Sequence, residues 1–118
     1  MSQNRLTTTV HELGPGQRAA PYHYQHGNEE WVLVLEGHPT IRDLDGEHRL
    51  EPGDVACFRR GSGGAHELRN ADTEVARVLV LATSFEPSVT HYPDDGTLRV
   101  TPPGKLFREA DAIASESD

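Results

Sequence analysis

The sequence predicts an all-β fold, built as a small antiparallel barrel or sandwich. Two observations lead to this prediction: runs of about four to eight β-favouring residues recur along the chain, and turn-forming Gly, Pro, Asp and Asn separate them. At 118 residues the chain is long enough to bury one hydrophobic core and too short for two. We therefore expect a single domain over residues 1–118, with the barrel core at about 16–82 and a C-terminal tail at 102–118.

Nine runs are predicted as strands, and most of them should pair antiparallel. They cover residues 6–12, 19–24, 30–36, 40–44, 48–50, 55–59, 66–70, 77–83 and 88–92. Asp45-Gly46, between the fourth and fifth runs, predicts a two-residue hairpin turn, because both central positions of such a turn need a positive φ. Pro52-Gly53-Asp54 predicts a turn that begins the next strand.

The C-terminal segment 105–114 is predicted to form one short helix. Its apolar residues have roughly the spacing of one helical face: Leu106, Phe107, Ala110 and Ile113. The last residues, 115–118, are expected to fray because nothing in their sequence ties them to a core.

Composition excludes several classes of function. The formal net charge is −8, and the eleven basic residues form no cluster that could follow a phosphate backbone, so nucleic acid is not an expected partner. No segment approaches the roughly 20 apolar residues of a membrane helix, and the N-terminus lacks an apolar signal-peptide core, so we expect a soluble, cytoplasmic protein without a membrane partner. Cys57 is the only cysteine, which excludes an internal disulfide, and it is interpreted as a buried small hydrophobe.

The run 30–36 is apolar on both of its faces. Alternation places Glu30, Val32 and Val34 on one face, and Trp31 and Leu33 on the other. A strand buried on both sides belongs in the middle of a layered β structure, and its second face needs cover from another layer or from a partner subunit. We therefore expect a homodimer. Because Glu30 is the first residue of this strand, we also expect it at the mouth of the interior.

Two imidazoles and one carboxylate lie beside these strands in the sequence. The same alternation places His23 and Gln25 on one face, with Glu30, and His66 follows the glycine-rich segment 61–64. Imidazole nitrogen and carboxylate oxygen together favour a divalent transition metal. Each residue also has a purely structural interpretation: His23 could end an edge strand, Glu30 could pair with an arginine, and His66 could simply finish the loop.

Two stretches of the chain resemble the two sequence motifs of the cupin superfamily. The first stretch matches at His23, Glu30 and Gly37, and the second at Gly53, Gly61, His66 and Asn70. The resemblance spans roughly residues 16–81, with Arg59 where the pattern has Pro and a loop two residues longer before His66. Asn28-Glu-Glu-Trp31 and Val34-Leu-Glu-Gly37 are similar to small bacterial single-domain cupins.

This resemblance implies a conical antiparallel β-barrel, the double-stranded β-helix or jelly-roll, holding one divalent metal through three His and one Glu. The matching ligands are His23, Glu30 and His66, while Gln25 occupies the place of the third imidazole. Gln25 offers a weak amide oxygen, unless His26 takes its place through a bulge. The expected cofactor is Fe, Mn, Ni or Zn.

The first functional hypothesis is a metal-dependent enzyme acting on a small oxygen-bearing molecule, of the dioxygenase, isomerase or decarboxylase type, with Glu30 as both ligand and proton acceptor. The alternative is a non-catalytic small-molecule-binding cupin with a weakened or vestigial metal site, which Gln25 favours. Arg59, Arg60 and Arg69 are candidates for binding a carboxylate, and the other histidines are interpreted as surface residues: His11, His38, His48 and His91.

Overall fold

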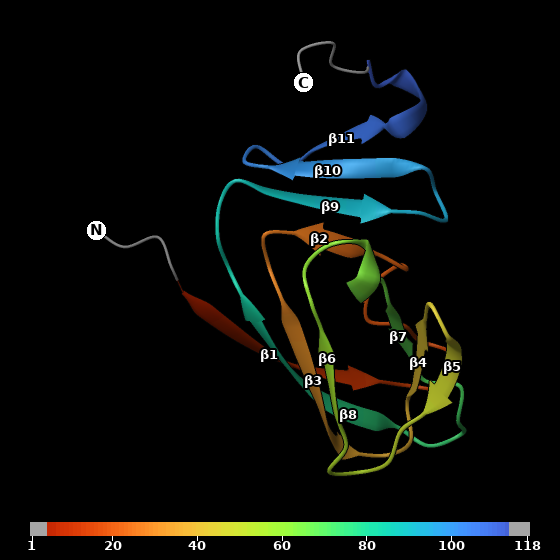
Figure 1. The fold of residues 1–118 in the computed structure, drawn as a ribbon. Helices are drawn as coiled ribbons and strands as arrows, with labels where there is room; N and C mark the ends of the chain where they lie inside the picture. The colour runs from red at the N-terminus through yellow and green to blue at the C-terminus, as the bar shows by residue number, and fades with distance from the viewer. Residues whose placement is uncertain (1–4, 114–118) are drawn as a thin grey trace.

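The structure, a computed structural model, describes residues 5–113. Its largest sheet has the strand order β1-β8-β3-β6 and pairs antiparallel throughout (Figure 1). These strands are β1 (Leu6–Leu13), β8 (Ala76–Thr83), β3 (Glu30–Glu36) and β6 (Val55–Phe58). The predicted all-β class is confirmed.

Two further sheets complete the fold. One has the order β5-β4-β7, with β5 (Gly46–Arg49), β4 (Thr40–Asp43) and β7 (Glu67–Arg69). The other has the order β11-β10-β9-β2, with β11 (Lys105–Arg108), β10 (Thr97–Thr101), β9 (Ser88–Tyr92) and β2 (Tyr24–His26). Figure 1 shows β9, β10 and β11 stacked at the upper end, with β2 joining them to the body.

The hydrophobic core lies against the inner face of β3. Val32 and Val34 are each 1% exposed, and Val78 of β8 is fully buried beside them, as the alternation predicted. The core is completed by Leu13, Ile41, Phe58 and Leu68. Each such side chain contributes about 1.5–3 kcal/mol when fully buried, so this cluster holds the sheets in place around the site.

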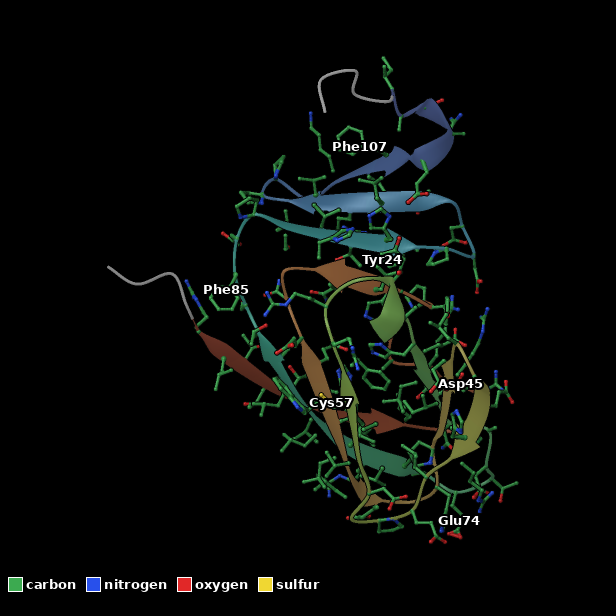
Figure 2. The ribbon with its side chains drawn as sticks, in the orientation of Figure 1. Tyr24, Asp45, Cys57, Glu74, Phe85 and Phe107 are labelled. Carbon is green, nitrogen blue, oxygen red and sulfur yellow. The ribbon has the colours of Figure 1, made fainter. Side chains whose placement is uncertain are left out.

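The outer face of the same sheet is apolar and open. Trp31, Leu33 and Val55 line a groove on it, and Val55 is 64% exposed. Cys57 shares this side of β6 and is exposed (Figure 2), so its interpretation as a buried hydrophobe is wrong. The reason is the strand parity: Phe58 takes the inward position, and Cys57, the residue before it, must point outward.

The expected closed barrel is not formed by the hydrogen bonds of residues 5–113, because the three sheets stay separate. Of the predicted strand 19–24, only Tyr24 belongs to a strand, as the first residue of β2, and the residues before it are irregular. Isolated bridges at Arg18 and His23 connect this part of the chain to β7 and to the residue before it. Gly14, Pro15, Gly16 and Pro21 explain this irregularity, since proline donates no backbone hydrogen bond and glycine weakens a strand.

The hairpin at residues 43–46 forms with its turn shifted by one residue. Asp43 pairs with Gly46, so Leu44 and Asp45 are the two loop residues, in place of the predicted Asp45-Gly46. Gly46 has a φ of 118°, and no described non-glycine residue has a positive φ. The positive φ at this hairpin therefore falls on a glycine, which adopts it without the steric clash that a side chain would cause.

The predicted C-terminal helix is wrong. Residues 105–108 form β11 and pair with β10 in the register Leu98↔Phe107, and only a single 3-10 turn, Glu109–Asp111, follows; Ala114 lies outside the described residues. Pro102-Pro103-Gly104 turns the chain back onto β10. The pairing of β11 with β10 then outweighs the weak helical spacing of the apolar residues. None of the helices in the described part has the length and apolar content to cross a membrane.

Candidate metal centre

Three distant segments bring His23, Glu30 and His66 together. His23 precedes β2 and His66 precedes β7, and an antiparallel bridge pairs the two: His23 N donates to His66 O at 3.1 Å, and His66 N donates to His23 O at 2.9 Å. Glu30 begins β3, in the largest sheet. The site is therefore built where the irregular segment before β2 meets the end of the central strand.

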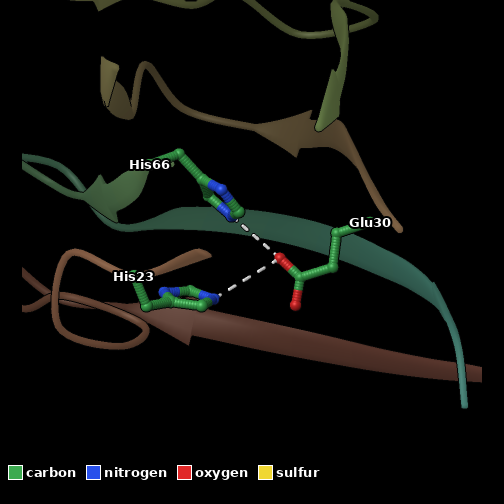
Figure 3. A group of neighbouring side chains, drawn as sticks. All are labelled: His23, Glu30 and His66. Carbon is green, nitrogen blue, oxygen red and sulfur yellow. Dashed lines mark hydrogen bonds and ion pairs between the residues drawn. The ribbon is translucent and has the colours of Figure 1, made fainter. Parts of the chain in front are cut away.

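The two imidazoles converge on one carboxylate oxygen (Figure 3). His66 Nε2 lies 2.8 Å from Glu30 Oε1, and His23 Nε2 lies 3.9 Å from the same atom. The three ligand atoms all lie within 4.8 Å of one another. Ligands that share an ion at about 2.0–2.2 Å are at most about 4.4 Å apart, so a small side-chain rotation would complete a common coordination sphere.

Backbone carbonyls select the tautomer of both histidines. His23 Nδ1 donates to Pro21 O at 2.8 Å, and His66 Nδ1 donates to Gly64 O at 2.8 Å. With its proton held on Nδ1, each ring can give the lone pair of Nε2 to a metal bound at the centre of the site. This second hydrogen bond is the usual support of a metal-ligating imidazole.

Packing fixes the rings further. Phe58 stacks on His66 with ring centroids 3.6 Å apart and planes 9° from parallel, while His23 lies 4.7 Å from His66. Both histidines are buried, at 8% and 5% exposure. Gly64 has to be glycine, because a Cβ there would lie 1.9 Å from Arg59 O, and its carbonyl is the acceptor that orients His66.

The protonation states of His23 and Glu30 favour metal binding. Burial lowers the pKa of His23, and the neighbouring His66 lowers it further, so His23 keeps its Nε2 lone pair free near neutral pH. Burial alone would raise the pKa of Glu30, but the hydrogen bond from His66 and the nearby imidazole charges outweigh it, and the pKa of Glu30 falls below its ordinary value. The carboxylate is therefore ionised.

Two hollows adjoin the triad. The first is a cavity of about 210 Å³, and the residues that line it with the triad are His11, Ala19, Ala20, Val32, Leu68 and Val80. The second is a crevice of about 10 Å³, close to the size of one water molecule, and Gln25, Asn28 and Arg59 are among its lining. The interpretation of His11 as a surface residue is therefore wrong: it is half-buried and faces the larger cavity.

Gln25 and His26 point to different places. Gln25 lines the crevice next to the triad, as strand parity predicted. His26 is exposed on the opposite side of β2, and its Nε2 contacts His91 Nε2 at 3.0 Å. His26 thus makes its contact away from the triad, while Gln25 lines the crevice beside it.

Other candidates have simpler roles. Arg69 pairs with Glu47 at 2.7 Å, and His48 contacts Asp43 at 3.0 Å on the surface. Asn70, part of the second motif, is fully buried and its side-chain nitrogen donates to the carbonyls of two segments, at Leu13 and Glu74. Asn70 is therefore a structural residue that ties β1 to the turn before β8.

The donor set has the chemistry of a transition-metal site. Two neutral imidazole nitrogens and one carboxylate oxygen are ligands of catalytic zinc and of non-haem iron, and both sets leave coordination positions open for water or substrate. His23, Glu30 and His66 fit such an ion in residue type, tautomer and separation. They could hold a divalent metal, and nothing in the set selects which one.

These features define a β-rich domain with a His, His, Glu cluster at its interior. The family model for the cupin domain matches residues 9–82, and the chain belongs to this family. A search of curated proteins found no match.

Several solved structures share the fold. A putative sugar phosphate isomerase from Acidithiobacillus ferrooxidans is 26% identical, with a TM-score of 0.88, 95% of this chain and 72% of that chain being covered. A cupin-superfamily sugar phosphate isomerase from Silicibacter pomeroyi is 27% identical, with a TM-score of 0.85 and coverage of 98% and 74%. The polyketide cyclase RemF from Streptomyces resistomycificus is 26% identical, with a TM-score of 0.60 and coverage of 71% and 58%.

Proposed function

We propose that this protein is a metal-dependent cupin isomerase whose substrate is a small phosphorylated sugar. The observation that carries the proposal is the convergence of His23 Nε2 and His66 Nε2 on Glu30 Oε1, beside a cavity of about 210 Å³. The substrate class is supported by the two sugar phosphate isomerases, whose similarity extends over 95% and 98% of this chain.

Interconversion of an aldose and a ketose moves one proton between neighbouring carbons and another between their oxygens. A divalent metal bound by the triad supplies Lewis acidity that polarises the substrate oxygens. Glu30 is ionised and held by His66 through Oε1, and we assign it to the transfer of the proton between the two carbons. His11 lines the cavity and is assigned to hydrogen bonding with a substrate hydroxyl.

Two residues of the narrow crevice complete the proposal. Gln25 is assigned as a weak fourth ligand through its amide oxygen, which lowers metal affinity relative to a third imidazole in the same place. Arg59 lines the same crevice and is itself exposed, so we assign its guanidinium to a phosphate bound at the mouth of the crevice, since a guanidinium binds phosphate oxygens in pairs.

The test begins with the protein purified without an affinity tag or chelator. Metal stoichiometry is measured, followed by aldose to ketose conversion of triose, pentose and hexose phosphates, each with Fe²⁺, Mn²⁺, Ni²⁺ or Zn²⁺. We expect at least one equivalent of bound metal and turnover of at least one phosphorylated sugar. Arg59→Ala should raise KM for that substrate and leave KM for the unphosphorylated sugar unchanged. A full metal site with no turnover of any substrate would contradict the isomerase assignment.

One observation favours a second candidate. Gln25 stands where the cupin motif has a third imidazole, and this neutral amide is expected if the site binds a molecule without transforming it. In that case calorimetry would detect sugar phosphate binding in the same samples, and nuclear magnetic resonance would show the bound sugar unchanged after prolonged incubation.

We also propose that the protein acts as a cytoplasmic homodimer. The groove on the outer face of the largest sheet has a volume of about 350 Å³ and an almost entirely apolar lining: Leu6, Trp31, Leu33, Val55, Leu79 and Leu81. A second copy would remove this surface from water. Light scattering should give twice the monomer mass for the wild type and the monomer mass for Val55→Asp. A monomeric wild type would contradict the dimer.

A further inference from the structure

A second cluster of imidazoles lies on the other side of β2 from the triad. His26 of β2 and His91 of β9 face each other with their Nε2 atoms 3.0 Å apart. The strand register explains the meeting: Tyr24 pairs directly with His91, so His26, two residues along, is its diagonal neighbour on the same face. The rings cross at 78° with centroids 4.9 Å apart.

His91 is held on two sides. Its Nδ1 contacts a carboxylate oxygen of Glu109, in the 3-10 turn that follows β11. Its ring stacks on Tyr24, with centroids 4.7 Å apart and planes 6° from parallel. Figure 2 labels Tyr24 beside the junction of β2 and β9. Because His91 Nδ1–H donates to Glu109, His91 Nε2 carries a lone pair and accepts the hydrogen bond from His26 Nε2. An ion shared by the two Nε2 atoms would replace this hydrogen bond and its proton.

The spacing of the two Nε2 atoms suits a shared ion. Two nitrogen ligands at about 2.1 Å, bound at right angles, lie about 3.0 Å apart. The carboxylate on the far nitrogen of His91 is the support that metal-bound imidazoles usually have. A pair of cross-strand imidazoles, here exposed His26 and partly buried His91, accepts Cu²⁺ most strongly among the divalent ions of the first transition series, with Ni²⁺ and Zn²⁺ binding less strongly.

We propose that His26 and His91 form a second metal site, distinct from the triad, which binds Cu²⁺, Ni²⁺ or Zn²⁺ through their Nε2 atoms. Glu109 is a positioning residue that orients His91. Water fills the remaining coordination positions. The ion ties β2 to β9, one of the contacts that join β9, β10 and β11 to the rest of the protein, so its role is to stabilise that contact.

The experiment is a titration of metal-free full-length protein with Ni²⁺ and, separately, Zn²⁺, followed by calorimetry and by the unfolding temperature. Wild type should bind two equivalents, while His26→Ala and His91→Ala should bind one. Glu109→Gln should keep both equivalents and weaken one of them about tenfold. His48→Ala, another exposed histidine paired with a carboxylate, is the matched control and should still bind two.

A second readout identifies the ligands. In a His66→Ala background, which disables the triad, one equivalent of Cu²⁺ should give an electron paramagnetic resonance spectrum with nitrogen splitting that disappears in His26→Ala. His26 is exposed, so its substitution is expected to leave the fold intact. The proposal would be overturned if His26→Ala and His91→Ala each still bound two equivalents of metal. It would also be overturned if the wild type, with metal already bound at the triad, took up no second equivalent. The result is independent of whether the protein isomerises sugars.

Discussion

His66 Nε2 and Glu30 Oε1 lie 2.8 Å apart although 36 positions separate the two residues in the sequence. In the metal-free protein this contact is a hydrogen bond that needs a proton on His66 Nε2, and metal binding would release that proton. The same oxygen lies 3.9 Å from His23 Nε2, so one carboxylate atom marks the centre of the site. The contact is the basis of the first predictions.

His66→Ala should lower the affinity for Zn²⁺ by at least about 100-fold, since losing a direct ligand costs more than the 10–100-fold typical of a supporting residue. Competition with a fluorescent chelator measures this change. His38→Ala, a half-buried histidine near Asp72, is the control and should bind the triad metal normally. Equal Zn²⁺ affinity in wild type and His66→Ala would show that His66 is not a metal ligand.

Gln25→His should strengthen metal binding about tenfold, because imidazole is a better ligand than an amide oxygen for transition metals. The side chain already lines the crevice beside the triad, so it needs no backbone change. The same competition assay checks the result, and Gln25→Ala serves as the control with weakened or unchanged binding. An unchanged affinity in Gln25→His would show that position 25 lies outside the coordination sphere.

The stability of the metal-free protein should fall as the pH is lowered. Burial depresses the pKa of His23, so below pH 6.5 the unfolded chain takes up a proton that the folded state refuses. The pKa of Glu30 is also lowered, so its contribution is present above pH 4.5 and is lost as the pH falls through the folded value. In both windows the unfolded state binds more protons, and the free energy of unfolding rises with pH.

Urea unfolding with a chelator, from pH 8 to pH 4, measures this dependence in wild type and His23→Gln. The variant should lose the part of the decrease that begins at pH 6.5. Superimposable pH profiles for the two proteins would contradict the assigned burial effect on His23.

Gly64→Ala should destabilise the protein by more than about 2 kcal/mol, because its Cβ would overlap a backbone oxygen that cannot move freely. That oxygen is Arg59 O, 1.9 Å away. Gly63→Ala is the matched control: its Cβ would meet only the Arg59 side chain, at 4.0 Å, so a change within about 0.5 kcal/mol is expected. Urea unfolding measures both, and equal effects would contradict the close packing at Gly64.

His11→Gln should lower kcat about 10–100-fold while metal stoichiometry stays at the wild-type value, since His11 faces the cavity and is not one of the three ligands. Steady-state kinetics on the substrate found in the isomerase screen gives the change. An unaltered kcat would remove His11 from the reaction, and a loss of metal would make it part of the metal centre.

Much of the site was predictable from local patterns. Alternation along residues 30–36 correctly separated buried Val32 and Val34 from outward Trp31 and Leu33, because side-chain direction in a strand depends only on parity. The cupin resemblance selected His23, Glu30 and His66 from a chain with seven histidines and many carboxylates. The same alternation along the chain correctly placed Gln25 beside the triad.

The failures concern contacts between distant segments. Residues 105–108 carry no strong strand pattern of their own, and only the pairing of Phe107 with Leu98 decides that they form β11. His91 looked like a surface residue until the register with Tyr24 brought it against His26. His11 faces the cavity because β8, far along the chain, pairs with β1.

By itself, the sequence determined the all-β class, the parity of the central strand and the chemical identity of the triad, since these depend on residue type and on the two-residue period of a strand. Only the tertiary structure decided the extent of the sheets, the cavity beside the triad and the second imidazole pair. Those features depend on the register between strands that are distant in the chain, and register is fixed by packing over the whole molecule.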